Sequence, residues 1–227
     1  MIKAVIFDLD GTILYTLDDL MNSMNEMLRY FSYPEHNDPN LHRLAIGTGA
    51  RNYVRGCLPE ELREDEKQID ICLAKYREIY AQHTNDKTRP YPGIMELLRS
   101  LSEMGVAMNV LSNKPDAPTK ALVKAWFSEF PFSCVYGERE GFPRKPNSAV
   151  PCAIAQALGL LPEEVAFIGD SGVDMQTGVN AGMLPIGVLW GYRDKEELVH
   201  NGAAYTAEKA EDIINILQQY NAQEEQK

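Results

Sequence analysis

The opening of the chain constrains its fold most strongly, because a short apolar run there ends abruptly in two aspartates. Residues Ala4–Phe7 are continuously apolar, which is typical of a strand buried on both faces of a parallel sheet. Asp8 and Asp10 follow at once. In open parallel sheets, chemistry collects at the carboxyl ends of the strands. Because two such carboxylates repel each other without a cation or a shared proton, the pattern predicts a metal site or an acid–base pair there.

The charge and the cysteines indicate which partners and which compartment to expect. The 227 residues include 22 Lys and Arg against 33 Asp and Glu, a formal net charge of −11 that repels nucleic acid and anionic lipid. No apolar run approaches the ~18 residues of a membrane span. The four cysteines form no Cys-x-x-Cys pattern, which favours free thiols in a reducing compartment. We therefore expect a cytoplasmic protein without nucleic-acid or membrane partners, whose oligomeric state the sequence does not indicate.

Two kinds of periodicity divide the chain into a helical block and an alternating block. After residue 14, apolar residues recur at helical spacing, as at Leu20, Met24 and Met27, and no strand pattern interrupts them. From Tyr91 onward, short apolar runs alternate with helical segments, which predicts a parallel sheet with helices on both faces. The chain therefore reads as one α/β core with a helical insert after its first strand. The later strands are expected at 106–111, 133–136, 165–168 and 185–189.

Polar side chains follow several of these expected strands. Ser112 comes directly after the strand 106–111, Lys145 opens a later helix, and Asp170 and Asp174 follow the strand 165–168. Each is by itself most often a turn residue or a helix cap. Parallel topology nevertheless brings strand ends to one edge of the sheet, so we expect these residues to meet Asp8 there.

The chemistry of this set points to phosphoryl transfer. Three carboxylates with backbone and water oxygens suit Mg²⁺. Asp170 and Asp174 are four residues apart and share a face if a helix starts there, so one is expected as a ligand and the other as its support. Lys145 would neutralise carboxylate and substrate charge, and Ser112 offers a hydroxyl beside amides that open a helix. A metal, a lysine, a hydroxyl and amides around a carboxylate describe a site that handles a phosphoryl group.

Four segments, FDLDGT, LSNK, RKP and IGDSGVD, resemble the four motifs of the haloacid dehalogenase superfamily in order and spacing. The resemblance extends from residue 2 to about residue 218. It implies an α/β fold with a Rossmann-like parallel sheet core and an inserted α-helical cap domain. The corresponding domains are 1–14 with 84–227 for the core and 15–83 for the cap.

The same resemblance implies roles for individual residues. Asp8 would be the nucleophile that forms an aspartyl-phosphate, and Asp10 would act as general acid and then as general base. An Asp at position 10 resembles the phosphatases and phosphomutases of the superfamily rather than its dehalogenases. Ser112 and Lys145 would bind the transferring phosphoryl group and act in catalysis. Substrate binding would also involve Thr12 and Asn113, and Mg²⁺ would be held by Asp8, the Asp10 carbonyl and Asp170, with Asp174 in support.

Further segments are similar to the phosphoglycolate-phosphatase group, among them Tyr91-Pro92-Gly93, Trp190-Gly191-Tyr192-Arg193 and the glycine-containing stretch Ile46-Gly47-Thr48-Gly49. Gly47 and Gly49 would let the backbone approach a ligand, and Arg51 or Arg55 would meet a substrate carboxylate. The alternative for both arginines is a solvated helix surface.

The sequence thus predicts a Mg²⁺-dependent phosphatase acting on a small phosphorylated metabolite, with phosphoglycolate as the first candidate substrate. Three alternatives within the superfamily stay open: an inorganic pyrophosphatase, a nucleotidase and a β-phosphoglucomutase. A fold alone does not certify an activity, so a catalytically silent protein that binds a phosphorylated metabolite is the alternative from another class.

Overall fold

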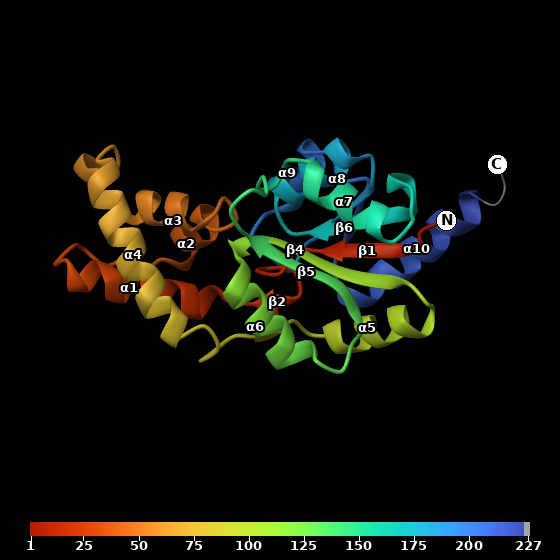
Figure 1. Ribbon diagram of the computed structural model, residues 1–227, viewed down its shortest axis with the longest axis horizontal. Coiled ribbons are helices and arrows are strands. Elements are labelled where there is room, and N and C mark those ends of the chain that lie inside the picture. The colour runs from red at the N-terminus through yellow and green to blue at the C-terminus, as the bar shows by residue number, and fades with distance from the viewer. Residues whose placement is uncertain (225–227) are drawn as a thin grey trace. The chain divides into compact units, whose positions relative to one another are not determined.

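The first strand, β1 (Ala4–Phe7), lies in the middle of a six-stranded parallel sheet in the computed structural model, which describes residues 1–224. The strand order is β5-β4-β1-β6-β7-β8, so β4 and β6 are the two neighbours of β1 (Figure 1). The predicted α/β fold with a parallel sheet is confirmed. The other strands of this sheet are β4 (Ala107–Pro115), β5 (Phe132–Glu138), β6 (Val165–Gly169), β7 (Leu184–Val188) and β8 (Tyr205–Ala207).

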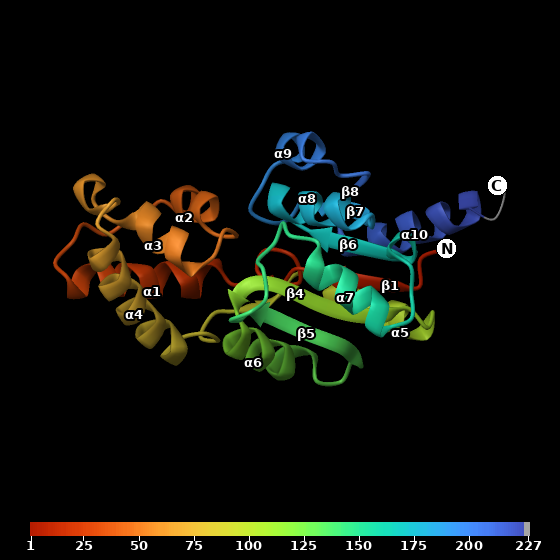
Figure 2. The ribbon, with the colours of Figure 1, turned by 45° about the horizontal axis from the view of Figure 1, so that its top comes forward.

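Helices cover both faces of the sheet, as the alternation of strands and helices predicted (Figure 2). Successive residues of a strand point to opposite faces, so Val5 and Phe7 pack with helices α5, α6 and α10 on one face. Ala4 and Ile6 pack with α7 and α8 on the other. Burial on both faces is the reason β1 is apolar throughout. The helices of this unit are α5 (Ile94–Glu103), α6 (Asp116–Phe127), α7 (Ala149–Ala157), α8 (Gly172–Ala181), α9 (Lys195–His200) and α10 (Ala210–Glu224), with the 3₁₀ turn η2 (Pro162–Glu164) before β6.

Residues Tyr15–Arg89 form a second compact unit, and Met1–Leu14 belong with the chain from Pro90 onward. The second unit is built from helices, as its periodicity predicted, and α1 packs against α4 within it. Its elements are α1 (Leu17–Tyr30), α2 (Pro39–Ala45), α3 (Ala50–Cys57), the 3₁₀ turn η1 (Glu60–Leu62) and α4 (Glu66–Gln82). Two short strands, β2 (Leu14–Tyr15) and β3 (Arg89–Pro90), pair with each other.

The compact helical unit ends at Arg89, and one buried carboxylate holds the segment after α4 against its first helix. Asp19, on α1, is 1% exposed. Its oxygens accept hydrogen bonds from the main-chain amides of Lys87 and Thr88 at 2.8–3.0 Å and from the Thr88 hydroxyl at 2.8 Å. These bonds fasten the segment after α4 to the first helix. Nothing in the helical periodicity of the sequence signals them, because they join residues nearly seventy positions apart.

The structure also corrects the limits of several expected elements. The strand expected at 106–111 extends over Ala107–Pro115, and the helix α4 begins at Glu66, because Asp65 caps it by accepting from the amides of Lys67 and Gln68. The helix α9 and the edge strand β8 were not anticipated, since both are too short to show a clear period. No helix among the described residues has the length and apolar character needed to cross a membrane.

Replacing Asp19 by Ala should destabilise the helical unit by roughly 2–4 kcal/mol, because the buried amide and hydroxyl of Thr88 and the partly buried amide of Lys87 lose their acceptor. Urea unfolding followed by circular dichroism measures this change. Asp18→Ala is the matched control, since the neighbouring carboxylate is 31% exposed and accepts from the Tyr15 hydroxyl. It should cost less than about 1 kcal/mol. Equal losses in the two variants would show that the Asp19 bonds carry no special stability.

Candidate active site

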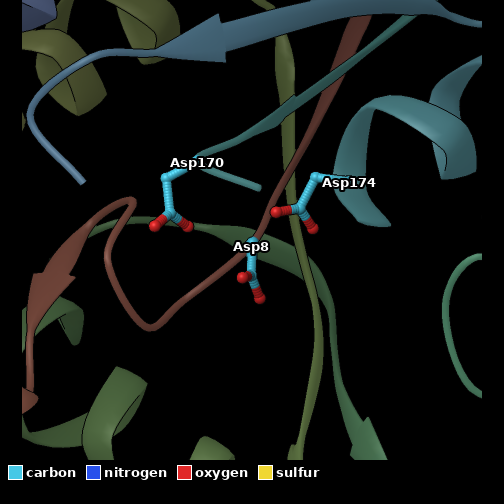
Figure 3. Close-up of side chains that lie close together, drawn as sticks. All are labelled: Asp8, Asp170 and Asp174. Carbon is cyan, nitrogen blue, oxygen red and sulfur yellow. The ribbon is translucent and has the colours of Figure 1, made fainter. Parts of the chain in front are cut away.

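Three carboxylates meet at the carboxyl edge of the sheet (Figure 3). Asp8 follows β1, Asp170 follows the neighbouring strand β6, and Asp174 lies in the first turn of α8. Each offers an oxygen that lies within 4.8 Å of the others, and all three residues are buried. Adjacent parallel strands therefore bring together residues that are more than 160 positions apart in the chain.

A buried lysine lies against two of these carboxylates. Lys145 Nζ is 2.8 Å from Asp8 Oδ1 and 2.7 Å from Asp174 Oδ1, and the lysine side chain is only 2% exposed. Burial by itself lowers the pKa of Lys145, but the charges of Asp174 and Asp8 outweigh burial and raise that pKa above its ordinary value. The ammonium is therefore positively charged, and it neutralises part of the negative charge gathered here.

Lys145 does not fully offset the effects of burial and repulsion on the pKa values of these carboxylates. Burial raises the pKa of Asp8 to about 6; Lys145 opposes this increase, while Asp174 and Asp10 add to it. Burial, Asp174 and Asp8 likewise raise the pKa of Asp170 well above its usual range. A cation among the oxygens would relieve both effects. Three convergent carboxylates fit a hard, oxygen-seeking ion such as Mg²⁺, so the donor set matches the metal that the sequence predicted.

Hydrogen bonds from the protein fix the orientation of the two carboxylates at the β6 end. Asp170 accepts from the Tyr192 amide at 2.7 Å and from the Thr12 hydroxyl at 3.1 Å. Asp174 accepts from the Ser171 hydroxyl at 2.6 Å and from the Ser171 amide at 3.1 Å. Thr12 was predicted to bind substrate, and in the structure its hydroxyl donates to a candidate metal ligand.

Two glycines make this close packing of carboxylates possible. Gly11 has φ +83°, and a Cβ there would lie 2.3 Å from Asp170 Oδ2. A Cβ on Gly169 would lie 2.3 Å from the Cβ of Asp174. Both glycines were visible in the motif sequences but were not singled out as site residues. Gly11 is needed because the distant Asp170 approaches it, and a single sequence gives no signal of that approach, whereas Gly169 meets Asp174 only five residues further along the chain.

The end of β4 supplies three consecutive polar residues, Ser112, Asn113 and Lys114, all buried. Asn113 Oδ1 accepts from the Lys145 amide at 3.0 Å, and Asn113 Nδ2 donates to the Lys145 carbonyl at 3.2 Å. Asn113 was predicted to contact substrate, and in the structure its side chain holds the main chain of Lys145. The Ser112 hydroxyl accepts from the Lys114 amide at 3.3 Å.

A second buried lysine, Lys114, belongs to the site, whereas the sequence pattern indicated Lys145 as the cation of this group. Lys114 Nζ lies 3.1 Å from Asp10 Oδ1 and 3.3 Å from Asp10 Oδ2, and its side chain is 3% exposed. The Asp10 side chain thus lies against Lys114 rather than among the three clustered carboxylates. The sequence signal that could have identified Lys114 is its position two residues after Ser112, within the segment LSNK.

The other predicted substrate-binding residues, Gly47, Gly49 and Arg51, lie in the helical unit. Both glycines have positive φ, +105° and +97°, and Gly49 caps α3. The Arg51 guanidinium forms ion pairs with Glu66 and Asp70 of α4. Arg51 therefore already has two carboxylate partners within its own unit.

Comparison with known proteins agrees with this architecture. The family model for haloacid dehalogenase-like hydrolases matches residues 5–188. The chain is 30% identical over 220 residues to phosphoglycolate phosphatase of Chromobacterium violaceum, covering 95% of this chain and 96% of that protein. It is also 30% identical over 208 residues to phosphoglycolate phosphatase of Rhodospirillum rubrum, covering 89% and 86%.

Solved structures show the same fold. A crystal structure from Lactobacillus delbrueckii subsp. bulgaricus superposes with a TM-score of 0.86 at 30% identity, covering 93% of this chain and 96% of that one. A haloacid dehalogenase-like family hydrolase from Streptococcus pneumoniae gives a TM-score of 0.85 at 24% identity, covering 95% and 98%. The second likeness concerns the fold alone.

Asp8→Asn should stabilise the metal-free protein relative to the parent, increasingly so as the pH rises from about 4 to 7. Because burial raises the pKa of folded Asp8 to about 6, the folded parent binds more protons than the unfolded chain between pH 3.8 and 6. The parent therefore loses stability across this window, and the variant avoids the loss. The difference should reach on the order of 2 kcal/mol by pH 7, measured by urea unfolding in the presence of a chelator.

Asp116→Asn provides a control of opposite sign. Although burial opposes it, hydrogen bonds from Lys120 and from the Gly137 amide lower the pKa of Asp116. The folded parent therefore gains stability from Asp116 above the unfolded pKa, and the Asn variant should lose stability as the pH rises. A pH-independent effect of Asp8→Asn would contradict the burial argument.

Proposed function

This chain belongs to the haloacid dehalogenase-like hydrolase family, and on that premise we propose that it hydrolyses a small phosphomonoester, with Asp8 as nucleophile and Mg²⁺ as cofactor. One observation carries the proposal. The buried Asp8 carboxylate lies 2.8 Å from the Lys145 ammonium and shares its edge of the sheet with Asp170 and Asp174. A carboxylate held beside a fixed cation, with donors for a second cation, is equipped to attack an anionic phosphorus centre.

The proposed first half-reaction forms a bond between an Asp8 carboxylate oxygen and phosphorus. The ester bond between phosphorus and the alcohol oxygen breaks, and that oxygen takes a proton from Asp10. Lys145 and the Ser112 hydroxyl would bind the transferring phosphoryl oxygens. Mg²⁺ held by Asp8, Asp170 and Asp174, with the Asp10 carbonyl, would neutralise the carboxylates and stabilise charge on the phosphoryl group.

In the second half-reaction, Asp10 takes a proton from water as the water oxygen attacks phosphorus. The bond between phosphorus and the Asp8 oxygen breaks, which releases inorganic phosphate and restores the carboxylate. Asp10 thus gives one proton and regains one, so the cycle balances. Its carboxylate lies beside Lys114 at the same edge of the sheet, two residues beyond the nucleophile.

Phosphoglycolate is the proposed substrate, because relatives that match nearly the whole chain at 30% identity are phosphoglycolate phosphatases. The resemblance assigns choice of the leaving group to the helical unit, with Gly47, Gly49 and Arg51 as candidate contacts. Because Arg51 is paired with Glu66 and Asp70, recognition of a substrate carboxylate by Arg51 would require exchange of these partners. A cytoplasmic location also remains our proposal, supported by four cysteines that are free thiols.

Asp8→Asn should reduce phosphate release at least roughly 1,000-fold, because the amide cannot serve as the nucleophile. Removing Mg²⁺ with a chelator should abolish activity, and adding Mg²⁺ should restore it. Asp116→Asn, a carboxylate outside the cluster, should retain the parent rate. Phosphate release from the parent and both variants gives the measurement. Parent-like turnover by Asp8→Asn, or by the chelated parent, would refute the mechanism.

A panel of phosphorylated metabolites separates the possible substrates. We expect the highest kcat/KM with phosphoglycolate. Preference for pyrophosphate, for a nucleoside monophosphate, or for transfer between glucose phosphates would instead identify a pyrophosphatase, a nucleotidase or a β-phosphoglucomutase. Binding of a phosphorylated metabolite without any turnover would favour the catalytically silent alternative.

A further inference from the structure

We propose that Lys114 is a positioning residue for Asp10, which it holds in the place from which Asp10 exchanges a proton with the leaving-group oxygen. The inference rests on the proposed function and adds one residue to it. It assigns the two buried lysines of the site to different tasks: Lys145 serves the nucleophile and the phosphoryl group, and Lys114 serves the general acid.

The first support is the geometry of the pair. The Lys114 ammonium lies 3.1 and 3.3 Å from the two oxygens of Asp10, so it contacts the carboxylate on both. The side chains are 3% and 11% exposed. An ion pair so deeply buried is not averaged out by solvent as a surface pair is. It therefore restricts the carboxylate to one orientation rather than merely neutralising it.

The second support is the place of Lys114 in the fold. It lies near the end of β4, the strand that pairs directly with β1, from which Asp8 and Asp10 follow. Ser112 and Asn113 precede it, and Asn113 holds the Lys145 main chain in the same way that Lys114 holds the Asp10 side chain. Two consecutive residues of β4 thus orient Lys145, which contacts the nucleophile, and Asp10, the general acid.

The chemistry explains why such a support is needed. A general acid must stay within about 2.6–3.2 Å of the oxygen it protonates. Asp10 follows β1 and stands just before the turn at Gly11, so regular strand pairing does not fix its side chain. When Asp10 carries the proton it took from water on one oxygen, its other oxygen still accepts from Lys114, so the contact can persist in both protonation states.

The test uses two esters that differ in their need for a general acid. p-Nitrophenyl phosphate has a good leaving group, whereas phosphoglycolate has an alkoxide leaving group that must be protonated. Lys114→Met should lower kcat/KM roughly 100-fold for phosphoglycolate and less than about 5-fold for p-nitrophenyl phosphate. Lys114→Arg should restore part of the loss. Lys120→Met is the matched control, since this lysine is 50% exposed and pairs with Asp116, and both rates should stay at the parent value.

A second measurement does not depend on activity. A double-mutant cycle of Lys114→Met and Asp10→Asn is followed by urea unfolding of the metal-free protein. Each single change leaves the other group buried without this partner. The double variant should therefore lose less free energy of unfolding than the two single variants lose together. We expect the unfolding equilibrium constant to differ by roughly tenfold from the additive value.

The outcomes separate the explanations. Equal losses on both esters would mean that Lys114 serves only the structure, and would overturn the proposal. A rise in KM confined to esters with a negatively charged leaving group would mean that Lys114 binds substrate, and would overturn it as well. Additive unfolding energies would show that the pair does not interact. If the parent hydrolyses neither ester, the proposed function fails, while the cycle still tests the contact between Lys114 and Asp10.

Discussion

Repulsion among buried carboxylates is the constraint on which the candidate site depends. Asp8, Asp170 and Asp174 are held so close that burial and mutual repulsion raise the pKa of Asp8 and Asp170. Lys145 offsets part of this charge, because its ammonium lies within 2.8 Å of two of the three. Such clusters of buried like charges are typical of functional sites, and a divalent cation bound among these oxygens would offset the remaining negative charge.

The sheet creates this arrangement, and the surrounding main chain preserves it. Strands β4, β1 and β6 are adjacent, so the residues at their carboxyl ends form one continuous group. Hydrogen bonds from other segments then hold two of these residues: Tyr192 and Thr12 donate to the Asp170 side chain, and Asn113 holds the Lys145 main chain. Thr12 and Asn113, which were predicted to bind substrate, thus also orient a candidate metal ligand and the main chain of Lys145.

The helical unit shows a different relation between sequence and structure. Its helices follow from local apolar periodicity, but its extent depends on Asp19, whose hydrogen bonds to Lys87 and Thr88 join the two ends of the unit. The arginines that resembled substrate ligands form ion pairs with α4, Arg51 with Glu66 and Asp70 and Arg55 with Glu66. The charge of an arginine does not show whether it binds a substrate carboxylate or forms an ion pair within the protein, since its partner is a carboxylate in both cases.

The sequence by itself determined the class of fold and which polar residues follow the strands. An apolar run such as Ala4–Phe7 is needed wherever a strand is buried on both faces, and the order of the polar motifs follows from the order of the strands. Only the tertiary structure decided which polar residues touch. The contact of Lys114 with Asp10, the hydroxyl of Thr12 on Asp170 and the space left by Gly11 all join segments distant in the chain. Hydrogen bonds and ion pairs act over a few ångströms, so these contacts depend on how the strands and loops pack, which local periodicity does not encode.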